Sequence, residues 1–277
     1  MTNTEKNKAF YNFAYNFLIE KTPNVITEKI IQSYLVVPSP ENSIHSLNTI
    51  FERMLESAQN RQMSVNVIGG AIGGVHKLGS VLKDFDVNYV LKTFPNEVQL
   101  LEVIEKEFTL KGKIRVDKKS LWPKYCKTII STATFLSQFK DSSEFLSWIK
   151  SFYNDDKSMA VLPLLISTEV YGFGFALVCD FLKELGFINY GKPDVHIKDI
   201  LTAYKFIPEK ATDYSVLKTM IVMSKDAGVS CYDFDKVLWL IGSGRFYNNP
   251  EIGKNGSIGR MKEDFISLWP DFEKIAK

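Results

Sequence analysis

The sequence predicts an all-α protein of 277 residues. Apolar residues recur mostly three and four positions apart, the spacing that gives a helix one buried face. The 10 prolines fall mostly near the boundaries of these periodic segments, where helices tolerate them. Hydrophobic residues make up 45% of the chain, which suffices for a well-filled core and argues against extensive disorder.

Periodic segments define the helices expected in the first half of the chain. They cover residues 9–18, 44–55 (entered through Ser39–Pro40), 100–108 (started by Pro95) and 129–139 (after Trp122–Pro123). Residues 34–37 and 114–116 are short exceptions that favour strands. The glycine-rich segment 69–74 lacks the Gly-Lys-Ser/Thr of a phosphate loop, so close helix packing or a turn is the better interpretation.

A charged, glycine-containing stretch at residues 111–119 interrupts the helical pattern. We therefore divide the chain into an N-terminal helical region, 1–119, which packs with the C-terminal helices, and a core, 120–277. The basic side chains of 111–119 are more typical of a solvated loop than of a phosphate site.

Composition excludes several classes of protein. With 34 basic and 32 acidic residues, the net charge of +2 neither demands nor excludes nucleic acid. Cys126, Cys179 and Cys231 form no Cys-x2-Cys pair, so thiolate zinc or iron–sulfur sites are not expected. The polar N-terminus and the absence of a run of about 18 apolar residues argue against a signal peptide or a membrane span. We expect a cytoplasmic, nucleoid-associated protein.

Residues 161–207 carry the functional signal. A short apolar helix, 161–167, leads into the turn Tyr171-Gly172-Phe173-Gly174, and a second helix follows over 175–185. Two alternating glycines let the backbone turn sharply without side chains that would obstruct an approaching surface. Free N–H groups at the start of the second helix are suited to bind a phosphate. Alone, such a turn is also a common structural connection.

A loop ending in Pro193 then places Asp194 at the start of another helix. The simplest interpretation of Asp194 is an N-cap. Next to a turn that binds phosphate, the same carboxylate has a second use, because it can face the sugar of the bound nucleotide.

The turn, the loop and the run Pro193-Asp194-Val195-His196 together resemble the helix-hairpin-helix–Gly-Pro-Asp (HhH-GPD) superfamily of DNA glycosylases. The run is most similar to its 8-oxoguanine DNA glycosylase and endonuclease III branches. The resemblance extends back toward Trp122 but not into the first 120 residues. It implies two helical lobes flanking a DNA-binding cleft, and double-stranded DNA with a damaged or modified base as the partner of a monomeric enzyme.

The resemblance also assigns roles to residues. Asp194 becomes the catalytic carboxylate, which stabilises the oxocarbenium-like sugar and positions water after the base has been flipped out of the helix. Backbone groups of the hairpin are expected to bind a DNA phosphate, and the Gly172 and Gly174 carbonyls to hold a monovalent cation. His196 lies near the backbone of the flipped nucleotide. The hairpin residues are Gly172, Phe173, Gly174 and Ala176.

One departure from the family is informative. Family members with lyase activity carry a lysine nucleophile where this chain has Ala176, so the resemblance implies a monofunctional enzyme that leaves an abasic site. Lys183 and Lys192 do not match that position, and we expect both to be solvated. A four-cysteine cluster is also missing, so no iron–sulfur cofactor is expected, and no other cofactor is implied.

The base pocket and the substrate are less defined. Tyr171 and Trp239 are candidates to line the pocket, although Trp239 is more typical of a core residue. Tyr171 and Phe173 would either press on the DNA backbone or anchor the hairpin. Asp233 is expected to cap a helix over 232–244, and Arg245 to meet a phosphate. The substrate is either an oxidised purine, as in repair, or a hypermodified base of foreign DNA, as in phage defence.

Two other classes of function remain open. A non-catalytic helix-hairpin-helix DNA-binding protein would use Asp194 only as a cap. A helical protein–protein adaptor would lack basic residues near the hairpin. In this chain we expect such basic residues there, namely Lys183, Lys192, Lys198 and Lys205.

Overall fold

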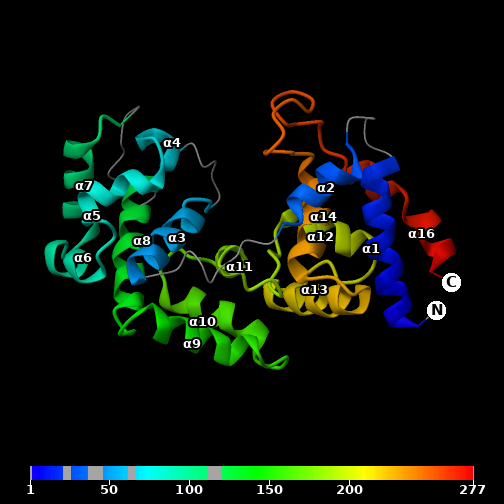
Figure 1. The fold of residues 1–277 in the computed structure, drawn as a ribbon, viewed down its shortest axis with the longest axis horizontal. Coiled ribbons are helices and arrows are strands. Elements are labelled where there is room, and N and C mark those ends of the chain that lie inside the picture. The colour runs from blue at the N-terminus through cyan, green and yellow to red at the C-terminus, as the bar shows by residue number, and fades with distance from the viewer. Residues whose placement is uncertain (1, 21–25, 37–45, 62–66, 111–119, 277) are drawn as a thin grey trace. The chain divides into compact units, whose positions relative to one another are not determined.

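The computed structural model describes residues 2–20, 26–36, 46–61, 67–110 and 120–276. Within these ranges the regular elements are helices, accompanied by two isolated β-bridges near Ser257, which confirms the all-α prediction (Figure 1). None of the helices in these ranges is both long and apolar enough to cross a membrane.

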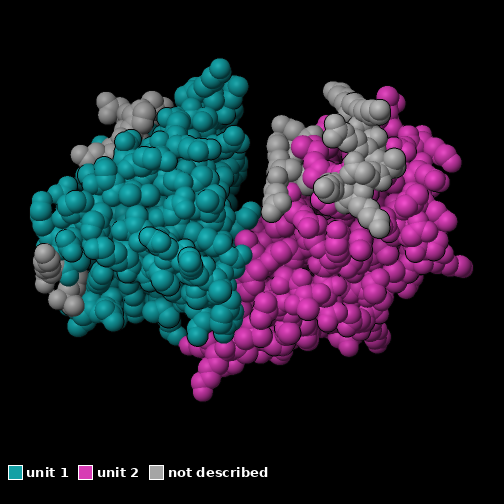
Figure 2. All heavy atoms as spheres, turned by 180° about the vertical axis from the view of Figure 1, so that it is seen from behind, with its two compact units in different colours: residues 1–38, 182–277 teal, residues 39–181 magenta. Residues whose placement is uncertain are grey.

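The chain forms two compact units (Figure 2). Unit 1 combines residues 1–38 with residues 182–277, and unit 2 is residues 39–181. The predicted boundary at 111–119 falls outside the described residues. The units instead divide the chain at other points, because the N-terminal helix packs with the C-terminal helices.

Unit 1 is built around α14 (Cys231–Ser243) and α12 (Val195–Ala203), which contact each other. Helix α1 (Asn3–Glu20) packs along α13 (Asp213–Ala227) and also contacts α14. The remaining helices of this unit are α2 (Glu28–Tyr34), α15 (Lys262–Ser267) and α16 (Trp269–Ile275).

Aromatic rings fill the core of unit 1. Phe10 of α1 lies 5.0 Å from the ring of Tyr204 and 5.7 Å from that of Phe272. Phe265 stacks on Tyr204 at 5.0 Å, and the Tyr204 hydroxyl donates to the Phe265 carbonyl over 2.6 Å. All four rings are fully buried, so residues from both ends of the chain close one core.

Helix α8 (Leu121–Leu136) is the centre of unit 2. It packs against α3 (Leu47–Ala58), α6 (Val87–Thr93) and α7 (Glu97–Glu107). The other elements are α4 (Gly69–Ile72), η1 (Val75–Leu78), α5 (Gly79–Leu82), α9 (Ser142–Tyr153), η2 (Met159–Val161) and α10 (Leu162–Glu169). Helix α11 (Phe175–Glu184) contains the division between the units.

Several predicted boundaries need correction. Tyr34 does not begin a strand, because Thr27 caps α2 and the helix runs to Tyr34. Helix α7 starts after Asn96, whose side chain accepts two amide hydrogens, rather than at Pro95. Trp122 belongs to α8, which begins at Leu121. The segments 39–40 and 114–116 fall outside the described residues.

Candidate active site

The predicted glycine hairpin lies between α10 and α11 in unit 2. Gly172 has φ of +77°, a backbone conformation that side chains strain. A Cβ added there would lie 2.5 Å from Nη1 of Arg61 and 2.8 Å from Oγ1 of Thr128. A Cβ added at Gly174 would meet nothing within 4 Å. The turn therefore requires glycine at the first position, whereas the second glycine leaves open space.

Free backbone amides follow this turn. The Gly174 carbonyl accepts the amides of Leu177 and Val178 at 2.9 and 3.1 Å, which starts α11. Among the described residues, the amides of Gly174, Phe175 and Ala176 have no acceptor. Unpaired N–H groups at the positive end of a helix attract anions, so these three amides are available to an anionic ligand.

The two aromatic residues of the hairpin differ. The side chain of Phe173 is 1% exposed and lies 5.9 Å from the ring of Phe181, so it anchors the turn in the core and cannot press on DNA. Any DNA contact at Phe173 would involve its backbone. Tyr171 is half-buried, and its amide donates to Oγ of Ser131 over 2.8 Å. Its ring remains a candidate for the pocket.

Two basic residues that were not predicted from the sequence, Arg61 and Lys127, lie beside this hairpin. The Arg61 guanidinium lies 5.4 Å from the centre of the Tyr171 ring, and Nζ of Lys127 lies 4.3 Å from it. Nη1 of Arg61 is buried without a hydrogen-bond acceptor in the described part of the chain. Arg61 lies 111 positions before Gly172, so no local spacing in the sequence predicts that it contacts the hairpin.

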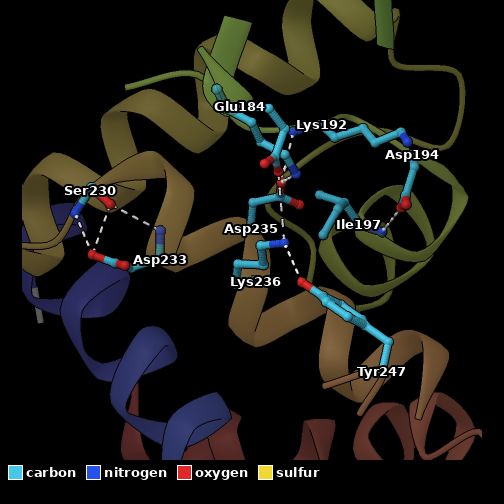
Figure 3. A network of polar contacts seen from close by, with 10 residues as sticks. Glu184, Lys192, Asp194, Ile197, Ser230, Asp233, Asp235, Lys236 and Tyr247 are labelled. Carbon is cyan, nitrogen blue, oxygen red and sulfur yellow. Dashed lines mark hydrogen bonds and ion pairs between the residues drawn. The ribbon is translucent and has the colours of Figure 1, made fainter. Parts of the chain in front are cut away.

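Asp194 in unit 1 caps α12, as the sequence predicted. Its Oδ1 accepts the amide of Ile197 at 3.2 Å (Figure 3). The same Oδ1 accepts the amide of His196 at 2.9 Å, whereas Oδ2 carries no hydrogen bond from any described residue. The side chain is half-buried. One carboxylate oxygen is thus fixed by the helix, and the other has no hydrogen bond from a described residue.

The surroundings of Asp194 shift its protonation. Burial raises the pKa of this carboxyl, and the neighbouring Asp235 raises it further. The Ile197 amide and the charges of His196 and Lys192 lower the pKa without cancelling these two effects.

A buried ion pair lies beside this loop in unit 1. Nζ of Lys183 is 2.5 Å from Oδ2 of Asp235, and the two residues are 5% and 1% exposed. The same Oδ2 accepts the backbone amide of Lys192 over 3.1 Å (Figure 3). The prediction that Lys183 is solvated is therefore wrong. Asp235 lies at helical spacing from the buried Cys231 and Leu238, so its place on the apolar face of α14 is the signal in the sequence for such a pair.

The loop before Asp194 is tightly packed. A Cβ on Gly191 would lie 2.5 Å from Cε of Met220 and 2.9 Å from Sγ of Cys231, so the backbone approaches α13 and α14 closely. The Lys192 carbonyl accepts the Asp194 amide over 2.8 Å. The backbone before the carboxylate therefore has one defined course.

His196 is half-buried against α14. A Cβ on Gly242 would lie 2.5 Å from Cβ of His196, so this glycine makes room for the imidazole. Nδ1 is buried without a hydrogen-bond partner among the described residues. Burial lowers the pKa of His196, as do Lys262 and Arg260, which outweighs the opposite effect of Asp194 and Asp199. A neutral imidazole near pH 7 follows.

The other predicted positions on α14 are partly revised. Ser230, rather than Asp233, is the N-cap, and Asp233 completes a capping box at the third helical position. Trp239 is half-buried, with its ring 5.8 Å from that of Tyr247. Arg245 is exposed.

The lysines that were expected near the hairpin make other contacts in the structure. Lys198 pairs with Asp213, and Nζ of Lys205 lies 4.8 Å from the ring of Trp269. Together with the buried Lys183, these lysines are engaged within unit 1. The basic groups that contact the hairpin are Arg61 and Lys127.

In the described ranges, no group of three or more His, Cys, Asp or Glu side chains is arranged to hold a metal ion. The Gly174 carbonyl already accepts two amides, so it is a poor ligand for the predicted monovalent cation. The Gly172 carbonyl stays a prediction.

Comparison with known proteins finds a distant similarity to a DNA glycosylase. The chain is 26% identical over 119 residues to an 8-oxoguanine DNA glycosylase/AP lyase of Korarchaeum cryptofilum (strain OPF8). The aligned region is 41% of this chain and 56% of that protein, so it spans little more than half of the relative. No protein-family model matches the chain. No solved structure matches it either.

Proposed function

We propose that this protein is a DNA glycosylase that hydrolyses the N-glycosidic bond of an oxidised purine in double-stranded DNA. The observation that carries the proposal is Asp194, a half-buried carboxylate with one oxygen fixed by α12 and the other unengaged among the described residues. The distant similarity to a protein named 8-oxoguanine DNA glycosylase/AP lyase supports both the reaction and the class of base.

Asp194 would act on the sugar. Departure of the base leaves positive charge on the deoxyribose, and a carboxylate held nearby stabilises that charge. The free Oδ2 is also suited to orient or deprotonate the attacking water. The raised pKa of Asp194 makes it a stronger base than an ordinary aspartate once it is ionised.

The hairpin would bind the DNA backbone. The unpaired amides of Gly174, Phe175 and Ala176 supply donors for one phosphate, and Arg61 and Lys127 add positive charge beside them. Because these contacts read no base edge, selectivity would come from the pocket that receives the flipped base. Tyr171 and Trp239 remain candidates for that pocket.

We further propose that the enzyme is monofunctional, unlike the relative, whose name includes AP lyase. Ala176 offers no amine at the position that the resemblance assigns to the nucleophile. Lys183 is buried in its ion pair with Asp235, so its ammonium is a poor nucleophile.

The test is base release from duplexes that carry one defined lesion. Purified protein is incubated with DNA containing 8-oxoguanine, alkylated purine, uracil or hypermodified cytosine, and released bases are identified by mass spectrometry. We expect release of the oxidised purine, and strand cleavage only after alkali. Release of hypermodified cytosine alone would move the function to foreign DNA, and tight binding with no release would indicate a non-catalytic DNA-binding protein.

Borohydride trapping tests the absence of lyase activity. A Schiff base between an amine and the sugar would be reduced to a stable covalent complex. We expect no such complex with the 8-oxoguanine duplex. A trapped complex that disappears in Lys192→Gln but persists in Lys183→Met would identify the loop lysine as the nucleophile and contradict the monofunctional proposal.

A further inference from the structure

Asp235 lies beneath the loop that carries Asp194. It is 1% exposed, and its Oδ2 binds two groups of different origin, the Lys183 ammonium of α11 and the Lys192 backbone amide of the loop. A charged acceptor makes the hydrogen bond to the amide stronger than a neutral one would. A hydrogen bond from the Lys192 amide to Asp235 therefore fixes the loop to α14 two residues before Asp194.

This tie acts together with close packing. Met220 and Cys231 occupy the space that a side chain at Gly191 would need, and the Lys192 carbonyl accepts the Asp194 amide over 2.8 Å. The position of Asp194 therefore depends on where the Lys192 peptide is held. Only Oδ2 of Asp235 is used in this way, because its Oδ1 is buried with no hydrogen-bond partner in the described part of the chain.

We propose that Asp235 is a positioning residue, which holds the Lys192 peptide so that Asp194 caps α12 with one oxygen and presents the other to the sugar. Lys183 provides the counter-charge that allows a carboxylate at this buried position. The catalytic consequence rests on the proposed glycosylase function, whereas the positioning itself does not.

The experiment compares two double variants that both remove the ion pair. Lys183→Met/Asp235→Asn keeps an acceptor for the Lys192 amide, and Lys183→Met/Asp235→Leu replaces it with an apolar side chain of similar size. Neither variant leaves a buried charge unpaired. Differences between the two therefore report on the hydrogen bond rather than on the charges.

The first readout is amide hydrogen exchange of the protein alone. The amides of His196 and Ile197 are protected by the Asp194 cap. We expect their exchange in the Leu variant to be about tenfold faster than in the Asn variant, the effect of losing one hydrogen bond. Equal protection of both amides in the two variants would overturn the proposal. This readout needs no enzymatic activity.

The second readout is the single-turnover rate of base release on the duplex that the wild type cleaves. The Leu variant is expected to release base about 10- to 100-fold more slowly than the Asn variant with DNA affinity unchanged, because small displacements of a reacting group are costly. Equal rates would overturn the catalytic consequence. A wild type that releases no base would refute the glycosylase function, and hydrogen exchange would still decide the positioning.

If the Leu variant does not fold, as judged by the loss of a cooperative thermal transition, a substitution in the loop tests the same hydrogen bond. Lys192→Pro removes the same amide donor from the loop side, and Lys192→Ala is its matched control, which keeps the amide and loses the side chain. Faster exchange of the capped amides in the proline variant only is the expected result. Equal exchange in both variants would overturn the proposal.

Discussion

The hairpin and the Asp194 loop present polar groups in opposite ways. At the hairpin, backbone amides have no acceptor among the described residues, Gly174 leaves open space, and Arg61 and Lys127 stand nearby. At the loop, the carboxylate of Asp235 is buried in an ion pair and binds the Lys192 amide. The first arrangement suits a ligand that approaches from outside, such as a phosphate. The second suits a group that must be held in one place.

This difference separates the expected effects of substitution. Changes at the hairpin should weaken DNA binding, whereas changes at the loop should slow base release or destabilise unit 1. The comparison fails if substitutions that open or fill the space at the hairpin slow base release at saturating protein, or if substitutions at the loop weaken DNA binding.

The largest effect is expected for Asp194→Asn. Loss of the carboxylate charge should slow base release by about 10³-fold, because it removes both stabilisation of the sugar and activation of water. Asparagine is an equally good N-cap, so the melting temperature should not fall. Single-turnover kinetics and thermal unfolding check the two statements. A variant that keeps most of the wild-type rate would leave Asp194 with a capping role alone.

The next largest effect is on the free energy of unfolding, and it distinguishes the buried Lys183–Asp235 ion pair from the more exposed Lys198–Asp213 pair. Asp235→Ala removes the carboxylate that pairs with the buried Lys183 ammonium and should cost about 3–5 kcal/mol of unfolding free energy. Asp213→Ala removes the partner of Lys198, where both side chains are about one-third exposed, and should cost about 0–1 kcal/mol. Urea denaturation measures both. Equal costs would show that burial of the Lys183–Asp235 pair is not energetically important.

The two hairpin glycines should separate stability from binding. Gly172→Ala combines a positive φ with a contact 2.5 Å from Arg61, so we expect a loss of about 1–3 kcal/mol in unfolding free energy. Gly174→Ala meets no neighbouring atom, so the fold should be unchanged. Its methyl group would enter the space of the phosphate and weaken DNA binding about tenfold. Fluorescence anisotropy with an undamaged duplex measures the second effect.

The smallest effect is a shift in pH dependence. Base release requires ionised Asp194, so the rate should fall as the pH drops through the pKa of this residue. Because burial and Asp235 raise that pKa, the fall should begin above the range of an ordinary aspartate, about 3.9. In Lys183→Met/Asp235→Asn the neighbouring negative charge is gone, and the fall should move to lower pH. His196→Asn is the control for histidine titration, and a shift to higher pH in the double variant would contradict this account.

Local patterns predicted much of the helical fold and the location of the two regions. The apolar spacing of residues 9–18 and the cap at Asp194 are local features, and both were visible in the sequence. Boundaries were missed where side-chain caps decided them, as at Thr27 and Asn96. There the hydrogen bond to the first turn outweighed the apolar or proline signal.

Long-range partners were not predictable in the same way. Arg61 meets the hairpin, and Lys183 meets Asp235 52 positions later, through packing that no spacing rule encodes. The raised pKa of Asp194 follows first from burial and then from the buried charge of Asp235, neither of which the local sequence around Asp194 indicates. Charged residues inside apolar helical runs are the available signal for such pairs.

The measurement that tests the central claim most directly determines DNA affinity and single-turnover rate on one 8-oxoguanine duplex for three proteins. These are the wild type, Gly174→Ala and Asp194→Asn. The account predicts that Gly174→Ala loses affinity but keeps its rate at saturating protein, and that Asp194→Asn keeps its affinity but loses the rate. Base release by Asp194→Asn at the wild-type rate would contradict a catalytic role for this carboxylate.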